Sequence, residues 1–302
     1  MRLLALLLLL PCAAAASPPA SLPPSSDTKP IRCDACAAWN APQAPFRVYG
    51  NTYYVGVAGL SSVLIDTGRG LILLDGALPQ SAPRIARSLR TLGFSLRDVK
   101  WLLNSHAHSD HAGGLAALQR LSGARVAASP AGAAALRAGA VAPDDPQVGF
   151  VAFRHFPAVR EVTPVADGQS VRLGDVVVTA HHTPGHTPGG VTWTWRSCEG
   201  ERCADVVYAE SLSAVAAPHF RFSADAARVA QLRRSIATVR ELPCDVMIPT
   251  HPAASRLFAQ WKASASGGRA AFLDAGACRA YAERAEQGLS ERLAKEAEGK
   301  AP

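Results

Sequence analysis

Ser105-His106-Ala107-His108-Ser109-Asp110-His111-Ala112-Gly113-Gly114 is the stretch around which the chain is organised. The apolar run before it, residues 99–103, predicts a buried strand, so the stretch lies on the loop that leaves this strand. While the backbone stays extended, side chains at i and i+2 point the same way. The first two histidines and the aspartate then share one side, and the third histidine points elsewhere. Imidazole and carboxylate groups together suit zinc. Three histidines and one aspartate within six residues therefore predict most of a two-metal site.

Two later histidines complete the site. One ion needs a third ligand beside His106 and His108, and the other needs a third beside Asp110 and His111. His186 lies in a Pro-Gly-His-Thr-Pro-Gly-Gly loop and His251 in Pro-Thr-His-Pro, both at the ends of predicted strands. Functional groups often lie on such loops, and the rigid neighbours fix the ring directions. Two ions that share a water can produce hydroxide near neutral pH, which is hydrolytic chemistry.

Four further histidines stand outside this set. For a lone histidine the ordinary role is a surface or hydrogen-bonded residue, and we expect that role for His155 and His181. His182 and His219 lie nearer to the candidate ligands in the sequence. A complete ligand set exists without either of them, so we assign them no role in the site.

The order of the remaining elements indicates an α/β protein. Short apolar runs broken by glycine predict four strands in an antiparallel meander, at residues 46–49, 52–57, 62–66 and 71–75. A helix follows, with Ser81 as its N-cap and Gly93 after its end. After the strand at 99–103, the patterns predict a helix near 114–121, a strand at 125–128 and an irregular loop over 139–160.

The second half repeats this order. Strands are predicted at residues 170–173, 176–181, 191–195, 206–208 and 246–248. A helix capped by Ser223 precedes the last of these strands, and a final helix presents Tyr281, Ala285, Leu289 and Leu293 on one face. Strands followed by alternating strands and helices, twice over, are consistent with two sheets packed face to face with helices outside, as a single domain.

The ends of the chain predict export. Residues 1–16 have a short basic start, an apolar run too short to span a membrane and small residues for cleavage, so they are typical of a signal peptide. Residues 17–35 are rich in Pro and Ser at first and predict a flexible segment before the domain at 36–302. We therefore expect a periplasmic protein without a membrane span. The formal net charge of +7 is scattered along the chain, which argues against nucleic acid as a partner.

Six cysteines remain once the signal peptide is removed. An even number in an exported protein favours disulfides. Our order of preference is Cys244–Cys278, then Cys198–Cys203, then Cys33–Cys36. The last pair lies in Cys33-Asp34-Ala35-Cys36 and alternatively forms a redox or zinc pair, although no second motif of this kind exists. None of the cysteines is expected to be catalytic.

These residues carry a family resemblance. The pattern His106-x-His108-x-Asp110-His111, with His186 and His251, is similar to that of the metallo-β-lactamase superfamily. The chain most resembles the class B β-lactamases of the third subclass, which are zinc-dependent carbapenemases. Residues 49–56, 184–190, 192–199 and 211–215 support this narrower match, as does Cys244 seven residues before His251. The resemblance covers the chain from about Cys36 to the C-terminal helix.

The resemblance implies an αββα sandwich with two Zn²⁺ at one edge of the sheets. It implies one zinc on His106, His108 and His186, and a second on Asp110, His111 and His251. The implied reaction is opening of the β-lactam amide of penicillins, cephalosporins and carbapenems by zinc-bound hydroxide, which confers antibiotic resistance. Asp110 has the catalytic role of orienting the hydroxide. The disulfide Cys244–Cys278 also fits the family.

The family further implies which residues contact substrate. Ser211 stands where the other two subclasses carry a cysteine ligand, and the resemblance implies that His111 binds the zinc ion in place of that cysteine. Ser211 and Ser213 help to hold the substrate carboxylate, and Gln147 resembles a substrate-contacting loop position. The partner is thus a small-molecule β-lactam, and we expect a monomer. One residue departs from the pattern: relatives usually have Asp where this chain has Glu210. Glu210 either acts behind the ligands, alters metal affinity or is a tolerated acidic replacement.

Two other readings remain open from the sequence. The first is a different hydrolase of the superfamily, such as a thioesterase, a lactonase or a phosphodiesterase, which the metal motif alone does not exclude. Export and Ser211-Leu212-Ser213 argue against it. The second is a non-catalytic secreted zinc-binding protein. Because all six ligands are present, this second reading has little support.

Overall fold

Short strands with tight connections form the larger of two sheets in the computed structural model, which describes residues 25–299. The sheet runs in the order β1-β2-β3-β4-β5-β6-β7. Its strands are β1 (Phe46–Tyr49), β2 (Thr52–Tyr54), β3 (Val63–Asp66), β4 (Leu71–Leu74), β5 (Val99–Leu103), β6 (Arg125–Ala128) and β7 (Val162–Pro164). The first four pair as the predicted antiparallel meander, and β4 to β7 are parallel. The parallel part directs the ends of β4 and β5 to the same edge of the sheet.

The second sheet has the order β12-β11-β10-β9-β8. Its strands are β8 (Ser170–Leu173), β9 (Val176–His182), β10 (Val191–Glu199), β11 (Arg202–Ala209) and β12 (Val246–Pro249). All neighbours are antiparallel except β11 and β12, which are parallel. A buried core that includes Tyr54, Trp193 and Tyr208 lies between the two sheets.

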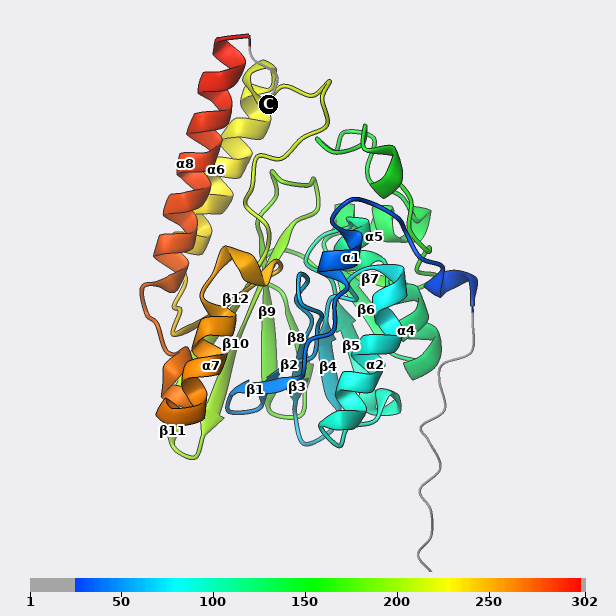
Figure 1. The fold of residues 1–302 in the computed structure, drawn as a ribbon, viewed down its shortest axis with the longest axis vertical. Helices are drawn as coiled ribbons and strands as arrows, with labels where there is room; N and C mark the ends of the chain where they lie inside the picture. Colours follow the sequence, from blue (N-terminus) through cyan, green and yellow to red (C-terminus); the bar gives the residue numbers. More distant parts are fainter. Residues whose placement is uncertain (1–24, 300–302) are drawn as a thin grey trace, which may run out of the picture.

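Helices flank the two sheets, and most of them cover an outer face (Figure 1). They are α1 (Cys36–Trp39), α2 (Ala82–Thr91), α3 (Ser109–Ala112), α4 (Leu115–Ser122), α5 (Pro130–Ala138), α6 (Ala226–Glu241), α7 (Leu257–Gly267) and α8 (Ala277–Ala297). One outer core holds residues of α2, α4 and α5 against the first sheet. Another holds residues of α6 and α8 against the second sheet. The four layers confirm the expected αββα sandwich.

The sequence patterns do not predict several of these elements, among them α5, β7 and α7. In α5, Leu136 is the one large apolar residue, and its other buried residues are alanine and glycine. β7 is three residues long, and α7 ends in a run of small residues. Such segments lack the periodic stripe of large apolar side chains on which these predictions depend.

The predicted N-cap of α6 is wrong. Ser223 lies in a 3-10 turn, Phe222–Ala224, and the backbone N–H of Ser223 is bound by the carboxylate of Glu296 at 2.7 Å. Asp225 caps the helix instead, because its side chain accepts a hydrogen bond from the Arg228 N–H at 2.8 Å. Serine and aspartate are comparable caps, so tertiary contacts of the preceding turn decide between them.

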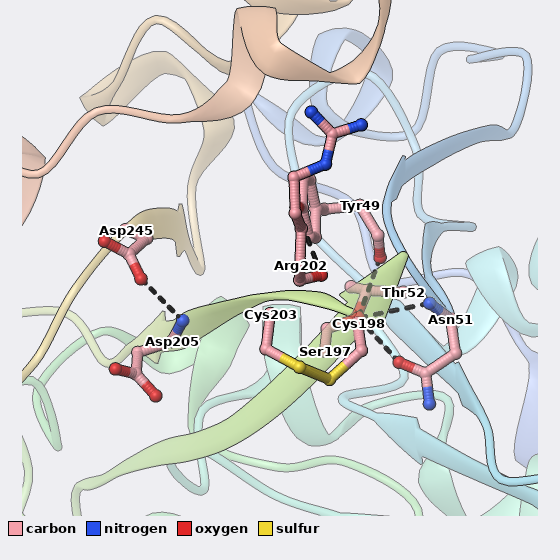
Figure 2. Close-up of a disulfide and its surroundings, with 9 residues drawn as sticks. All are labelled: Tyr49, Asn51, Thr52, Ser197, Cys198, Arg202, Cys203, Asp205 and Asp245. Carbon is pink, nitrogen blue, oxygen red and sulfur yellow. Dashed lines mark hydrogen bonds between the residues drawn. A yellow bond between two sulfur atoms is a disulfide. The ribbon is translucent and has the colours of Figure 1, made fainter. Parts of the chain in front are cut away.

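All three expected disulfides are present: Cys244–Cys278, Cys198–Cys203 and Cys33–Cys36. The disulfide leaves no thiolate at Cys33 or Cys36 for zinc, and it is also the form that an oxidised redox pair takes, so the redox alternative stays a prediction. Cys198–Cys203 closes the β10–β11 hairpin (Figure 2). Beside it, the Ser197 hydroxyl lies 2.9 Å from the Tyr49 carbonyl oxygen and ties this hairpin to the first sheet.

The segment before the domain contacts it closely where it is described. The backbone of Ile31 exchanges two hydrogen bonds with the Gln80 side chain, at 3.1 and 2.9 Å. Asp27 forms an ion pair with Arg120 of α4 at 2.7 Å. Within residues 25–299, no helix has the length and apolar character needed to cross a membrane. The predicted signal peptide, residues 1–16, lies outside the described residues.

Candidate metal centre

The loop after β5 carries four of the six candidate ligands. Helix α3 begins directly after His108, whose own backbone angles are extended. The predicted alternation therefore holds for His106 and His108 but is wrong for Asp110, which lies in the first turn of α3. The helix is followed by a close approach of the backbone to Pro79, because a Cβ on Gly113 would lie 2.4 Å from Cδ of Pro79. The helical turn of α3 brings Asp110 and His111 close to His106.

His106, His108 and His186 form the first group of donors. Each offers a nitrogen within 4.8 Å of the others, and all three side chains are buried. Their ring centroids lie 4.9 to 5.0 Å apart. His186 reaches this position from the loop between β9 and β10. This arrangement can hold a metal ion.

Each of these histidines has an acceptor on its outer nitrogen. Nε2 of His108 lies 3.1 Å from both carboxylate oxygens of Asp145. Nδ1 of His186 lies 2.9 Å from the Ser213 carbonyl oxygen. Nδ1 of His106 lies 3.2 Å from the Ser105 hydroxyl. Such contacts fix the ring orientation of metal-binding histidines and select the nitrogen that faces the ion. Consistent with this, Nε2 of His106 is buried and has no hydrogen-bond partner among the described residues.

Asp110, His111 and His251 form the second group. Oδ2 of Asp110 lies 3.2 Å from Nε2 of His111 and 3.3 Å from Nε2 of His251, and the two Nε2 atoms are 3.1 Å apart. Two donors held about 2.0–2.1 Å from one tetrahedral ion lie about 3.3–3.4 Å apart. The three atoms thus span one face of a coordination tetrahedron. His106 lies near this group as well, with donor atoms of His106, Asp110 and His111 within 4.8 Å of one another.

The electrostatics favour the metal-binding protonation states of His106, His186 and Asp110, whereas Asp110 and Asp75 outweigh burial at His111 and raise its pKa. Burial, together with the neighbouring histidines, lowers the pKa of His106 well below its ordinary value and that of His186 to about 3. Burial alone would raise the pKa of Asp110, but His111 and His251 outweigh it and hold the pKa well below its usual range. Neutral imidazoles and an ionised carboxylate are the forms that bind a divalent ion.

Asp75 is a buried aspartate that contacts the outer sides of both groups, through Ser105 beside His106 and directly at His111. The sequence patterns do not identify it as a site residue. Asp75 follows β4 directly, has no exposed surface and adopts a positive φ of 57°. Its carboxylate accepts hydrogen bonds from the Ser105 hydroxyl at 2.5 Å and the Tyr208 hydroxyl at 2.9 Å. It also lies 3.7 Å from Nδ1 of His111. The signal for it is a charged residue at the end of a wholly apolar strand that neighbours β5.

Glu210 lies on the outer side of the first group. Its carboxylate is buried, with Oε1 3.6 Å from Nδ1 of His106, the ring nitrogen opposite the one that faces the site. Neither oxygen has a hydrogen-bond partner among residues 25–299. Burial, with the charges of Asp75 and Asp145, raises the pKa of Glu210 well above its ordinary value. The structure thus places Glu210 behind the candidate ligands.

The predicted substrate residues lie around the first group. Nε2 of Gln147 is 3.3 Å from Nε2 of His186. Ser213 is exposed, and its hydroxyl is 3.2 Å from Nδ1 of the same histidine. Ser211 is buried and pairs with the Thr250 hydroxyl at 2.8 Å. Trp39, which the sequence analysis does not single out, packs against His251 with ring centroids 5.4 Å apart.

The other histidines have separate surroundings. Nε2 of His181 lies 2.9 Å from the Thr194 hydroxyl, and Nε2 of His182 lies 3.0 Å from the Val165 carbonyl oxygen. His155 and His219 are exposed. None of the four belongs to either donor group.

Comparison with known proteins identifies the family. A model described as the metallo-beta-lactamase superfamily matches residues 55–251. The chain belongs to the metallo-β-lactamase superfamily. It is 53% identical to the Rm3 metallo-β-lactamase, with 88% of this chain and 99% of that chain covered and a TM-score of 0.85. It is 52% identical to MEM-A1, a subclass B3 metallo-β-lactamase from a soil metagenome library, with 87% and 100% covered and a TM-score of 0.84.

Curated relatives of this metallo-β-lactamase-fold chain are more distant. Hydroxyacylglutathione hydrolase from Anaeromyxobacter dehalogenans (strain 2CP-C) is 31% identical over 151 residues, which is 49% of this chain and 44% of that enzyme. The chain thus spans less than half the length of that relative. The full-length structural matches confirm the predicted similarity to the third subclass.

Proposed function

We propose that this chain is a zinc-dependent β-lactamase that hydrolyses the amide bond of penicillins, cephalosporins and carbapenems and so confers resistance to them. The observation that carries the proposal is the pair of adjacent groups of three donors. They occur in a chain that is 53% identical to the Rm3 metallo-β-lactamase over 88% of its own length. A distant family match alone would support an assignment of the fold but not an assignment of the substrate.

The donor atoms fit zinc. The first group consists of three imidazole nitrogens and the second of two imidazole nitrogens and one carboxylate, with no thiolate in either, and the spacing in the second group suits a tetrahedral ion. We assign His106, His108 and His186 to one Zn²⁺, and Asp110, His111 and His251 to the other. When bound, two zinc ions supply a hydroxide at neutral pH and stabilise the charge that develops on the substrate.

The protein's own residues orient the reactants. Asp110 stays ionised and is the one carboxylate within the two groups, so we assign it the catalytic role of orienting the attacking water. Asp145 and the Ser213 carbonyl fix the rings of His108 and His186 from outside. A strained four-membered amide needs little proton donation to its leaving nitrogen.

Substrate contacts are assigned to the residues that surround this centre. Gln147 and Ser213 lie beside His186, and Ser211 lies beside Thr250. Hydroxyl and amide groups at these positions can donate hydrogen bonds to the carboxylate that β-lactam antibiotics carry. We assign Ser211 and Ser213 to this carboxylate, and Gln147 to the remainder of the substrate.

We further propose that the protein acts as a monomer in the periplasm. Residues 1–16 have the composition of a cleaved signal peptide, residues 17–35 lead into the domain, and residues 36–302 form it. Three disulfides support an oxidising compartment. The partner is a small-molecule β-lactam, with neither nucleic acid nor a membrane span involved.

A thioesterase is the second candidate, because curated relatives include a hydroxyacylglutathione hydrolase. The position of Glu210 argues against it. A carboxylate that joins two metal ions must lie between the donor groups, whereas Glu210 lies on the outer side of His106.

The test is a comparison of substrates. Purified protein with zinc should hydrolyse a penicillin, a cephalosporin and a carbapenem with kcat/KM values far above that for a glutathione thioester. A higher kcat/KM for the thioester than for all three lactams would overturn the proposal and favour the thioesterase. A Ser213→Ala variant, which keeps the carbonyl contact to His186, should raise KM for the lactams and bind zinc normally.

A further inference from the structure

Asp145 contacts both His108 and the backbone of Gln147, and the proposed metal and substrate contacts do not explain why one residue makes both contacts. It lies in the irregular segment between α5 and β7 and is 2% exposed. Both of its carboxylate oxygens are 3.1 Å from Nε2 of His108. The same carboxylate, through Oδ1, accepts a hydrogen bond of 2.8 Å from the backbone N–H of Gln147. One buried carboxylate therefore contacts both a candidate metal ligand and the backbone that presents a candidate substrate residue.

The contact with His108 fixes the tautomer of this histidine. If Nε2 faces a carboxylate, it carries the proton, and Nδ1 is then the nitrogen with a free lone pair for the metal. The backbone N–H of Gln147 and the protonated Nε2 of His108 both approach this carboxylate as donors. The carboxylate is thus an acceptor for both of its contacts.

The contact with Gln147 shapes the segment. An aspartate that accepts from the N–H two residues later forms a compact turn. This turn places Nε2 of Gln147 at 3.3 Å from His186. Its base is also held by Arg228 of α6, which donates to the Asp144 carbonyl oxygen at 2.7 Å. Beyond the turn the segment is open to solvent, and Val151 is 80% exposed.

We propose that Asp145 is a positioning residue that couples metal binding at His108 to the conformation of the segment carrying Gln147. A metal ion on His108 fixes the ring, the ring fixes the carboxylate, and the carboxylate fixes the turn at residues 145–147. Because coupling free energy is reciprocal, an ordered turn also favours metal binding. The inference deepens the proposed function and rests on it for the role of Gln147, but the coupling between metal and segment does not depend on which substrate is hydrolysed.

The first measurement uses the native protein and needs no substrate. Hydrogen–deuterium exchange is followed in metal-free protein and in protein saturated with zinc. Zinc should slow exchange in the peptide that contains Gln147 as well as in peptides of residues 105–112. If zinc slows exchange at 105–112 but leaves residues 145–150 unchanged, the coupling is refuted. This result stands even if a variant fails to fold.

The second measurement uses Asp145→Asn, with Asp144→Asn as its neighbour control. Asparagine has a single acceptor oxygen, so its NH₂ group would face either the protonated Nε2 of His108 or the Gln147 N–H. We expect a roughly 10- to 100-fold loss of zinc affinity in competition with a chromophoric chelator. At saturating zinc, residues 145–150 should remain in fast exchange, and KM for a cephalosporin should rise more than kcat falls.

The control and the conservative variant separate coupling from general damage. The Asp144 side chain is largely exposed and pairs with Arg228, while its carbonyl keeps the shorter contact to that arginine. Asp144→Asn should therefore bind zinc like the native protein. Asp145→Glu retains two acceptor oxygens and should recover part of the lost zinc affinity.

The outcomes distinguish this inference from the proposed function. Native zinc affinity in Asp145→Asn would overturn the coupling, even if the protein hydrolyses β-lactams. Zinc-dependent ordering of residues 145–150 in a protein that hydrolyses no β-lactam would uphold the coupling and reject the proposed function.

Discussion

Gly185 supports the position of His186 through its lack of a side chain, and Gly185→Ala tests this directly. Gly185 has φ +139°, a conformation that residues with a Cβ rarely adopt. A Cβ at this position would lie 2.6 Å from both Cα and Cβ of Leu232 in α6. The Ser235 hydroxyl of α6 also donates to the Pro184 carbonyl oxygen at 2.6 Å, so the loop has little freedom to move away.

The expected cost follows from these distances. Carbon atoms in contact lie about 3.5–4.0 Å apart, so the loop or the helix must move by about 1 Å. Backbone strain of about 1–3 kcal/mol and overpacking of about 1–3 kcal/mol give a total loss of about 2–6 kcal/mol in the free energy of unfolding. A displacement of about 1 Å at a catalytic group can cost on the order of 100-fold in rate. We therefore expect weaker zinc binding and a similar loss of kcat/KM for a carbapenem.

Gly93→Ala is the matched control. Gly93 also has a positive φ, +85°, but nothing lies within 4 Å of the added Cβ. This variant should lose only about 1–2 kcal/mol and bind zinc normally. Urea denaturation measures both free energies, and chelator competition measures zinc affinity. If Gly185→Ala is no less stable than Gly93→Ala and binds zinc equally well, the packing argument for His186 is refuted.

Three further changes test other parts of the structure. His251→Ala removes one donor of the second group, so bound zinc measured by elemental analysis should fall from two ions to one. The kcat/KM for a carbapenem should also fall at least ~10–100-fold. Retention of two zinc ions would contradict the assignment of His251 as a ligand. Replacing Cys244 and Cys278 by serine opens a loop with a sequence separation of 34 and should lower the free energy of unfolding, measured by urea denaturation, by about 4 kcal/mol. A loss below about 1 kcal/mol would show that the disulfide adds little stability. Glu296→Gln should cost about 1.5–3 kcal/mol near neutral pH, because the carboxylate accepts from main-chain N–H groups and from Arg292. These hydrogen bonds lower the pKa of Glu296 from 4.5 to about 2 despite its burial, so the stability they add is present above pH 4.5 and is lost as the pH falls toward 2. The difference between Glu296→Gln and native protein should shrink over that interval, and a difference that is constant with pH would refute the role of the charge.

The sequence predicts the features of this fold that repeat or cluster. The meander from β1 to β4 follows from apolar runs broken by glycine, and α6 follows from Leu232, Ile236 and Val239 on one face. The six candidate ligands stand out because histidine and aspartate are concentrated on loops at strand ends. The structure brings all six together in two adjacent groups.

Other features depend on distant contacts, which a single sequence does not display. Asp75 ends an apolar strand and Asp145 follows Asp144 on a loop, and their contacts with the site appear only when Ser105 and His108 are placed beside them. The N-cap of α6 is decided by Glu296, which follows it by more than 70 residues. α5 buries mainly alanine and glycine, and a loop approaches it so closely that a Cβ on Gly189 would lie 2.4 Å from the Gly132 backbone nitrogen.

The most direct test of the proposed zinc-dependent β-lactamase activity is hydrolysis of a carbapenem during stepwise return of zinc to metal-free protein. The purified protein is treated with EDTA and dialysed, and the rate is measured as zinc is added. The proposed function predicts no turnover without metal and a rate that rises with zinc until both donor groups are filled. Turnover that survives complete removal of metal would contradict it, as would a protein that holds two zinc ions and opens no β-lactam.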